Sequence, residues 1–250
     1  MIRFFQEFNS TIEKAIASSF YHVSLGHPKR EDTRQIIIVT NKIFKRAIDL
    51  SMSLILLLMS LPIFIVVAIA VKLSSKGPVF FTQERIGYKN RKFFIYKFRT
   101  MKQETSKDDH QEYIKYLLKE GSQNNDEANL LIKHINYIES RTTKVGAFLR
   151  VTSLDELPQL FNIIKGDMSL VGPRPHPVYE VNEYKKWYYR RLDVKPGLTG
   201  WSKLNLRCTP KYYEEAILYD LWYVDHWTVK LDMLIMILTV PFVLSTKEAY

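Results

Sequence analysis

Two adjacent carboxylates, Asp155 and Glu156, have the clearest capacity for chemistry in this sequence of 250 residues. The spacing of Ser153 and Glu156 is that of a capping box, so the sequence predicts that a helix begins here, with Pro158 in its first turn. The positive end of that helix should favour ionisation of both carboxylates. Neighbouring helical residues point about 100° apart, so one carboxylate could attack phosphorus while the other holds Mg²⁺. Plain helix capping is the alternative interpretation.

Two arginines near these carboxylates suit phosphate oxygens. Arg150 precedes Asp155 by little more than one helical turn, and Arg174 lies in Gly172-Pro173-Arg174-Pro175, where the prolines stiffen the backbone. A planar guanidinium can bind phosphate oxygens through two parallel hydrogen bonds. Both arginines could instead be structural, with Arg150 capping carbonyls or pairing with Asp167 and the proline loop merely rigid. Together with the two carboxylates, they predict a diphosphate site.

A predicted β-hairpin supplies a third cation. The segments 79–86 and 93–101 are rich in aromatic residues that favour strands, and a polar stretch beginning at Gly87 joins them. Strand alternation places Lys97 and Arg99 on one face, which predicts a cationic surface turned toward a ligand. A solvated edge strand is the alternative.

One class of metal site fits the sequence. The six histidines show no HxxxH spacing and the single cysteine is Cys208, which argues against a zinc site and an internal disulfide. An oxygen-ligand site of the kind that holds Mg²⁺ remains. The Gly- and Pro-containing run at 196–201 is interpreted as a structural turn and is left outside the predicted site.

A long apolar segment, 47–71, places this chemistry beside a membrane. Its only charge is Asp49, and it meets the length and composition of a membrane segment. Basic residues flank both ends, as is typical of cytoplasmic ends, and Pro62 near the middle removes a helical hydrogen bond. The sequence therefore predicts a re-entrant helix hairpin over 41–76, broken at Pro62. A straight transmembrane helix is the alternative. The flanking cations are Lys42, Lys45, Arg46, Lys72 and Lys76.

The chain is divided into three parts on this basis. Residues 1–40 are predicted as an N-terminal amphipathic or linker segment, 41–76 as the membrane hairpin, and 77–250 as a cytoplasmic catalytic domain. Within the domain, 103–143 is predicted as a charged helical insert and 227–245 as an interfacial helix. The expected fold class is α+β, mostly helical with a small β-hairpin, in a monotopic membrane protein.

The net charge of +10 favours anionic partners such as lipid headgroups or a phosphorylated substrate. Nucleic acid is not an expected partner, because the sequence shows no recognised reading helix or zinc module.

Five ordered motifs resemble those of a known family. They are KRAIDL, GPVFFTQERIG, YKFRTM, SLDELPQLFNIIKGDMSLVGPRP and VKPGLTGW. From about Asn41 to the C-terminus they look like the bacterial sugar transferases, the monotopic initiating phosphoglycosyl transferases. No apolar multi-span region precedes Asn41, so the resemblance is to the compact catalytic type. The chain departs from the family in having Leu61-Pro62 where Ser-Pro is common, and in its longer insert.

The resemblance implies transfer of a sugar 1-phosphate from a nucleotide sugar, expected to be a UDP-sugar, to polyprenyl (undecaprenyl) phosphate. Such a reaction initiates exopolysaccharide, capsule, glycoprotein glycan or lipopolysaccharide O-antigen synthesis at the bacterial inner (cytoplasmic) membrane, with the catalytic domain facing the cytoplasm. It implies Asp155 as the nucleophile of a covalent phosphosugar intermediate and Glu156 as a ligand of the Mg²⁺ cofactor. Lys97, Arg150 and Arg174 fall where the family surrounds the nucleotide diphosphate. A non-catalytic membrane adaptor of a glycan assembly complex is the alternative function.

Overall fold

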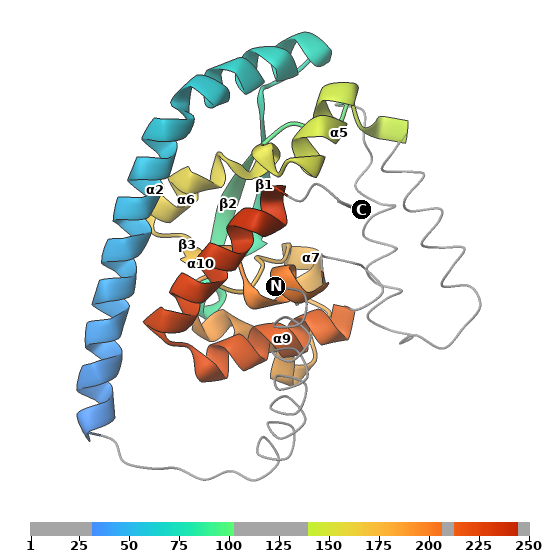
Figure 1. The fold of residues 1–250 in the computed structure, drawn as a ribbon. Coiled ribbons are helices and arrows are strands. Elements are labelled where there is room, and N and C mark those ends of the chain that lie inside the picture. The colour runs from blue at the N-terminus through green and yellow to red at the C-terminus, as the bar shows by residue number, and fades with distance from the viewer. Residues whose placement is uncertain (1–31, 103–139, 207–212, 245–250) are drawn as a thin grey trace, which may run out of the picture. The chain divides into compact units, whose positions relative to one another are not determined.

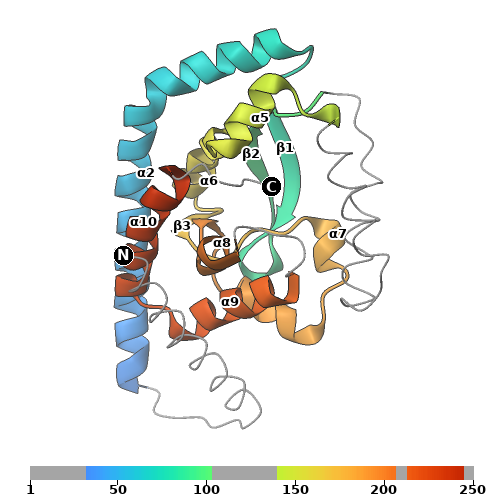
Figure 2. The ribbon, with the colours of Figure 1, turned by 45° about the vertical axis from the view of Figure 1, so that its right-hand side comes forward.

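The apolar segment forms one long helix, α2 (Asp32–Ser74), which contains Pro62. Proline has no N–H to donate, and close by the Ser60 hydroxyl donates to the Leu57 carbonyl at 3.2 Å. Figures 1 and 2 both show α2 changing direction toward its C-terminal end, drawn in teal. By length and composition, Asn41–Ser74 could cross a membrane, and little of it is buried. The predicted apolar helix is confirmed, and its re-entry into one side of a membrane stays a prediction.

The structure is a computed structural model that describes residues 32–102, 140–206 and 213–244. Residues 1–31 of the predicted N-terminal segment and 103–139 of the predicted insert lie outside this part of the chain. The chain divides into two units, 1–43 and 44–250, and all contacts described below lie within the second.

The predicted β-hairpin is confirmed. It consists of β1 (Phe80–Ile86) and β2 (Lys92–Phe98), joined through a short 3-10 turn, η1 (Tyr88–Asn90). The strands pair antiparallel, with Phe80 opposite Phe98 at the open end.

Arg99 lies just beyond β2 and not on its ligand-facing side. Its buried guanidinium donates to the carbonyls of Val71 and Ser75 at 3.3 and 2.6 Å, at the C-terminal end of α2. The prediction that Arg99 shares a cationic face with Lys97 is therefore wrong. Helix carbonyls without an intrahelical partner attract a cation, and Arg99 satisfies them.

The predicted helix start at Ser153 takes a different form. Helix α5 (Lys144–Val151) is followed by a 3-10 turn, η2 (Leu154–Glu156), and then by α6 (Gln159–Lys165). Ser153 has a φ of 55°, in the left-handed region, and its side chain makes no capping hydrogen bond. The predicted capping box does not form, because Ser153 turns the chain between two helical segments. Pro158 immediately precedes α6 and does not lie in its first turn.

The C-terminal part adds a second strand pair, which the sequence did not predict. Strand β3 (Ser169–Val171) pairs in parallel with β4 (Gly197–Thr199), and each has only three residues. The connection between them includes α7 (Val178–Val181) and the 3-10 helix η3 (Lys186–Asp193). The chain continues through α8 (Trp201–Leu206), α9 (Tyr213–His226) and α10 (Val229–Leu244). The prediction of a mostly helical α+β fold is confirmed for the described residues.

A polar stripe on α2, formed by Lys45, Arg46 and Asp49, binds the backbone of the domain. Arg46 donates to two carbonyls at the C-terminal end of α6, at 2.7 and 2.9 Å. The buried Asp49 carboxylate accepts from the Ser169 hydroxyl and the Leu170 N–H of β3, both at 3.0 Å. The single charge within the apolar segment is thus a structural contact to β3.

Lys45 extends the polar stripe to α10. Its ammonium donates to the Val171 carbonyl at 3.0 Å and to Asp232 at 2.6 Å. Asp232 also accepts from the Tyr223 hydroxyl at 2.7 Å and from the Trp227 indole at 3.0 Å. The first turn of α10 is therefore tied to α2 and β3. The predicted interfacial position of this helix is not tested by these contacts.

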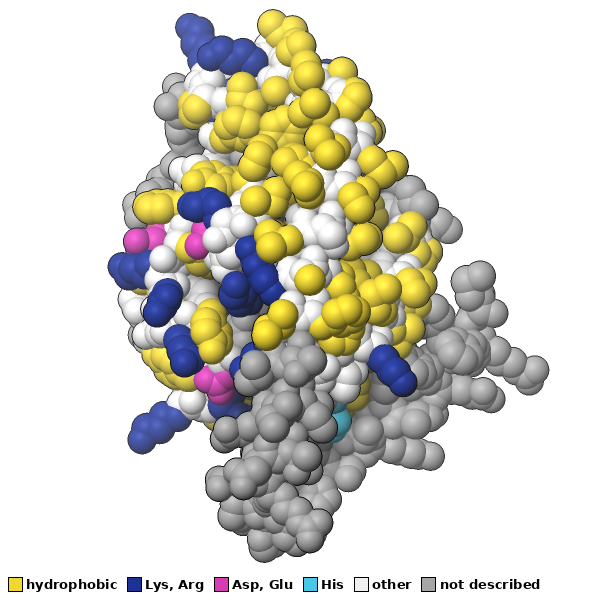
Figure 3. Space-filling view, turned by 90° about the vertical axis from the view of Figure 1, so that its left-hand side faces the viewer, with side chains coloured by type: hydrophobic (Ala, Val, Ile, Leu, Met, Phe, Trp, Pro, Cys, Tyr) yellow, Lys and Arg dark blue, Asp and Glu magenta, His cyan; other side chains and the backbone are white. Residues whose placement is uncertain are grey.

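The C-terminal end of α2 packs on the elements that carry the predicted site. A buried apolar cluster combines residues of α2, β2 and α5, with Leu154 and Leu157 packed against it on either side of the two carboxylates. Its buried members are Val67, Val71, Phe98 and Leu149. Other apolar side chains of α2 are exposed and form the yellow surface in Figure 3, with basic side chains beside it. Such a surface favours contact with lipid.

Candidate active site

A cleft that is partly open to solvent lies between β2, the loop after β3, and β4 with the start of α8. Its charged lining consists of four basic residues and one carboxylate: Arg85, Lys97, Arg174, Lys203 and Glu156. Three glycines contribute backbone to the same wall: Gly172, Gly197 and Gly200. An excess of cations in a partly buried cleft favours a polyanionic ligand.

Glu156 is held between two lysines. Lys97 donates to one carboxylate oxygen at 2.9 Å and Lys203 to the other at 2.6 Å. All three side chains are less than one-fifth exposed, at 14%, 19% and 16% respectively. Burial alone favours the protonated acid, but Lys203, Lys97 and Arg174 outweigh it and hold the pKa of Glu156 well below its ordinary value. The predicted ionisation of this carboxylate agrees with the structure.

Asp155 lies next to this ion pair in a less polar position. Its carboxylate is 3.5 Å from the Lys97 ammonium, and the residue is buried. Burial raises the pKa of Asp155 above its ordinary value, and the nearby Glu156 charge adds to this, although Lys97 opposes it. The prediction that both carboxylates favour ionisation is therefore wrong for Asp155. Asp155 lies in the 3-10 turn η2 and not in the predicted first turn of a helix, and desolvation is the largest cause of its pKa shift.

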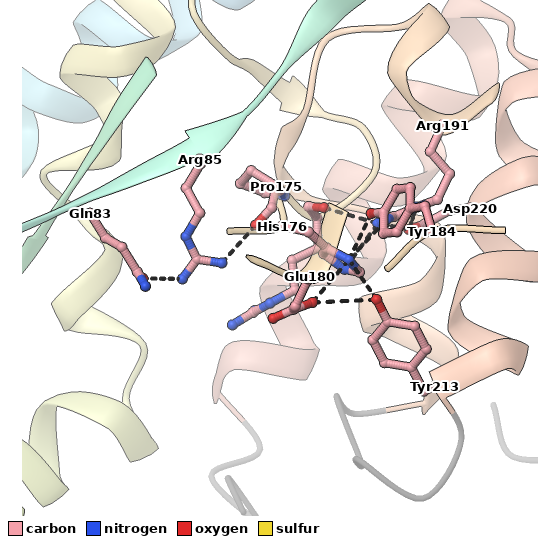
Figure 4. Close-up of polar contacts among 10 residues, drawn as sticks. Gln83, Arg85, Pro175, His176, Glu180, Tyr184, Arg191, Tyr213 and Asp220 are labelled. Carbon is pink, nitrogen blue, oxygen red and sulfur yellow. Dashed lines mark hydrogen bonds and ion pairs between the residues drawn. The ribbon is translucent and has the colours of Figure 1, made fainter. Parts of the chain in front are cut away.

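Arg174 reaches the cleft from the loop that follows β3. Its charge helps to lower the pKa of Glu156, and it lines the cleft together with Arg85 of β1. Arg85 donates to the Pro175 carbonyl at 2.9 Å and to Gln83 at 2.6 Å, as Figure 4 shows. Burial lowers the pKa of Arg85 to about 10, with the nearby Arg174 charge acting in the same direction and Glu180 opposing it. Sequence reasoning did not single out Arg85, although it lies within the motif GPVFFTQERIG.

Arg150 is close to Asp155 but is not among the residues that line the cleft. Its guanidinium donates to the hydroxyls of Thr100 at 3.0 Å and Thr142 at 3.4 Å. Its charge still acts to lower the pKa of Asp155. The structure thus brings Lys97, Arg174 and Glu156 together in one cleft, whereas Arg150 and Asp155, the neighbour of Glu156 in the chain, are not among its lining residues.

The glycine-containing run that was interpreted as a structural turn lines the cleft. A Cβ on Gly197 would lie 2.1 Å from the backbone nitrogen of Gly172, and one on Gly172 would lie 2.4 Å from the Lys195 carbonyl. Side chains at these positions would push the two loops apart. Lys203, two residues after Trp201, was also missed, because no local pattern marks a single lysine at the start of a helix.

The donor set fits Mg²⁺ bound together with a phosphorylated ligand. Among the described residues, no group of three or more His, Cys, Asp or Glu side chains could hold a metal ion alone. Mg²⁺ usually takes one or two carboxylates, and substrate phosphates and water complete its octahedral shell. Glu156 lines this cleft and Asp155 is its neighbour in the chain, so the two supply that number of carboxylates, with the Glu156 oxygens bound by Lys97 and Lys203 in this structure.

Comparison with known proteins assigns the family. Residues 40–246 match the family described as Bacterial sugar transferase, so the chain belongs to that family. It is 40% identical over 196 residues to the UDP-glucose:undecaprenyl-phosphate glucose-1-phosphate transferase of Xanthomonas campestris pv. campestris, covering 76% of this chain and 36% of that protein. It is 36% identical over 211 residues to the undecaprenyl-phosphate galactose phosphotransferase of Salmonella typhimurium, covering 84% of this chain and 42% of that protein.

A shorter relative matches over most of its length. The uncharacterized sugar transferase EpsL of Bacillus subtilis is 39% identical over 205 residues, which cover 82% of this chain and 89% of that protein. The chain therefore spans less than half of the two transferases above but nearly all of this relative. The predicted family resemblance is confirmed.

The two lysines lead to a prediction about stability. Lys203→Met should lower the free energy of unfolding by about 1–3 kcal/mol, because a buried carboxylate loses one of its two cations. The double variant Lys203→Met, Glu156→Gln should recover part of this loss, since the uncompensated charge is gone. Thermal unfolding in detergent measures both. Equal losses in the single and double variants would contradict the assignment of Glu156 as a buried ion held by Lys203.

Proposed function

We propose that this chain transfers a sugar 1-phosphate from a UDP-sugar to undecaprenyl phosphate and so initiates synthesis of a bacterial surface glycan. The observation that carries the proposal is the cleft in which ionised Glu156 lies between two lysines, beside the buried Asp155. Family membership supports it, because named relatives act on undecaprenyl phosphate. UDP-glucose and UDP-galactose are the first donors to test, on the names of those relatives.

In the proposed first step, Asp155 is the nucleophile. One of its carboxylate oxygens bonds to the β-phosphorus of the donor, while the bond from that phosphorus to the bridging oxygen breaks. Uridine monophosphate (UMP) leaves with the electron pair, and the sugar phosphate stays on Asp155. In the second step, a phosphate oxygen of the polyprenyl carrier attacks the same phosphorus and releases Asp155.

The cations of the cleft offset the negative charge of both steps. Lys97, Arg174, Arg85 and Lys203 surround the space next to Glu156, so they can pair with the two donor phosphates. Arg150 acts on Asp155 through its charge, which favours the carboxylate form. Glu156 is the proposed Mg²⁺ ligand, and bound Mg²⁺ would neutralise charge on the phosphates.

The proposed location is the inner membrane, with the domain in the cytoplasm and α2 entering and leaving on the cytoplasmic side. The support is the apolar surface of α2, its change of direction, and the basic residues at both ends of the apolar segment 47–71. A UDP-sugar is a cytoplasmic substrate, which requires this orientation. In this arrangement the long lipid tail of the carrier stays in the bilayer and presents its phosphate to the cleft.

Activity and its loss in site variants test the proposed reaction. Purified protein with Mg²⁺, undecaprenyl phosphate and UDP-glucose or UDP-galactose should release UMP. Asp155→Asn should lower the rate by more than about a thousandfold, because the amide cannot serve as the nucleophile. Glu156→Gln should lower it by roughly a hundredfold, and removal of Mg²⁺ with a chelator should abolish it.

Arg190→Lys, which changes an exposed arginine paired with Asp225, is the matched control and should keep the wild-type rate. Full turnover by Asp155→Asn would exclude Asp155 as the nucleophile. Absence of UMP release by the wild-type protein would instead favour the non-catalytic membrane adaptor.

Cysteine labelling tests the topology of α2. Cys208 is first replaced by Ser, and single cysteines are then introduced as Lys42→Cys and Lys76→Cys, on either side of the apolar segment. A membrane-impermeant maleimide should leave both sites unlabelled in intact cells and label both in inverted vesicles. Labelling of one site in intact cells and the other only in inverted vesicles would show a straight transmembrane helix.

A further inference from the structure

The loop that carries Arg174 is held by a buried polar network. Arg191 of η3 and Asp220 of α9 form its centre, with both side chains only 2% exposed. The Arg191 guanidinium donates to Asp220 at 2.9 Å from Nε and at 2.6 Å from Nη2. Figure 4 shows these residues converging on the loop at His176.

Arg191 contacts the loop backbone at Arg174 itself. Its Nη2 atom donates to the Arg174 carbonyl at 2.9 Å. The next carbonyl, that of Pro175, accepts from Arg85 at 2.9 Å. The buried Arg191 and the half-buried Arg85, from different elements, therefore hold consecutive peptide groups, and the prolines on either side of Arg174 restrict its backbone further. The direction in which Arg174 leaves the loop depends on these contacts.

The surroundings of Arg191 leave it few alternative positions. Nη1 lies 3.1 Å from His176 Nδ1 and also donates to the Tyr184 hydroxyl. Burial and the neighbouring arginines hold the pKa of His176 well below its ordinary value, so its ring is neutral at physiological pH. A neutral ring can accept from Arg191, whereas a charged ring would repel it.

A buried ion pair is costly to desolvate, and a hydrophobic pair of similar size often stabilises a fold as well or better. Fold stability alone thus gives weak grounds for placing Arg191 and Asp220 here. The hydrogen bond from Arg191 to the carbonyl of Arg174, a residue that lines the cleft, gives a stronger reason. We propose that Arg191, held by Asp220, is a positioning residue that keeps the Arg174 guanidinium directed into the cleft. The inference rests on the function proposed above, in which Arg174 binds the donor diphosphate.

A double-mutant cycle separates positioning from a general structural role. Arg191→Lys keeps the charge but lacks the planar fork that reaches Asp220 and the Arg174 carbonyl together. Steady-state UMP release is measured with UDP-glucose and UDP-galactose, and unfolding temperature is measured on the same samples. Arg174→Gln should raise the KM for the donor about tenfold, as expected for one charged hydrogen bond.

Arg191→Lys should raise the same KM about threefold to tenfold, with kcat within about twofold of wild type. The double variant should have the KM of Arg174→Gln alone, because Arg191 acts only through Arg174. Arg190→Lys, the matched control, bonds Asp225 and joins the same two elements, and it should leave KM unchanged. If Arg191→Lys does not fold, Asp220→Asn takes its place in the cycle with the same expectation.

Two results would overturn the positioning role and leave the proposed function intact. One is a rise in KM in the double variant equal to the product of the two single rises. The other is a fall in kcat and unfolding temperature in Arg191→Lys without a change in its KM. Absence of UMP release by the wild-type protein with either donor would overturn both.

Discussion

The bonds between the polar stripe of α2 and the backbone of α6 and β3 are the constraint on which the rest of the structure depends. Arg46 holds the end of α6, and Asp49 holds β3. The two carboxylates lie just before α6, and the Arg174 loop follows β3, so one membrane-associated helix supports both walls of the cleft. Because buried polar groups are costly when unpaired, these bonds define a specific docking geometry.

The electrostatics of the cleft follow from this arrangement. Glu156 stays ionised because Lys97 of β2 and Lys203 of α8 each bind one of its oxygens. Asp155 is buried, and the nearby Leu154 and Leu157 pack against the apolar cluster that includes α2. The pKa of Asp155 is thus raised and that of Glu156 is lowered, although the two residues are adjacent in the sequence. Groups whose environments separate their pKa values in this way are suited to different tasks, which is the division of roles proposed for them.

The sequence predicted the long apolar helix, the hairpin and the three site residues Lys97, Glu156 and Arg174, because each lies in a local pattern or motif. The sequence-based predictions were wrong where contacts with distant segments determine how a side chain is oriented or ionised. The orientation of Arg99 depends on the end of α2, and the pKa of Asp155 depends on burial, and neither is visible in local spacing. Lys203 and Arg191 contribute through pairing with Glu156 and Asp220, which lie far away in the sequence.

The central claim, that Asp155 becomes covalently bonded to the sugar phosphate, is tested most directly by intact-mass measurement. Purified protein is mixed with UDP-glucose or UDP-galactose and Mg²⁺, without undecaprenyl phosphate, quenched in acid and then digested to locate any added mass. The account predicts an adduct of one hexose phosphate on the peptide containing Asp155, its loss when undecaprenyl phosphate is added, and its absence in Asp155→Asn. Sugar transfer to the carrier without any adduct, or an adduct on another residue, would contradict it.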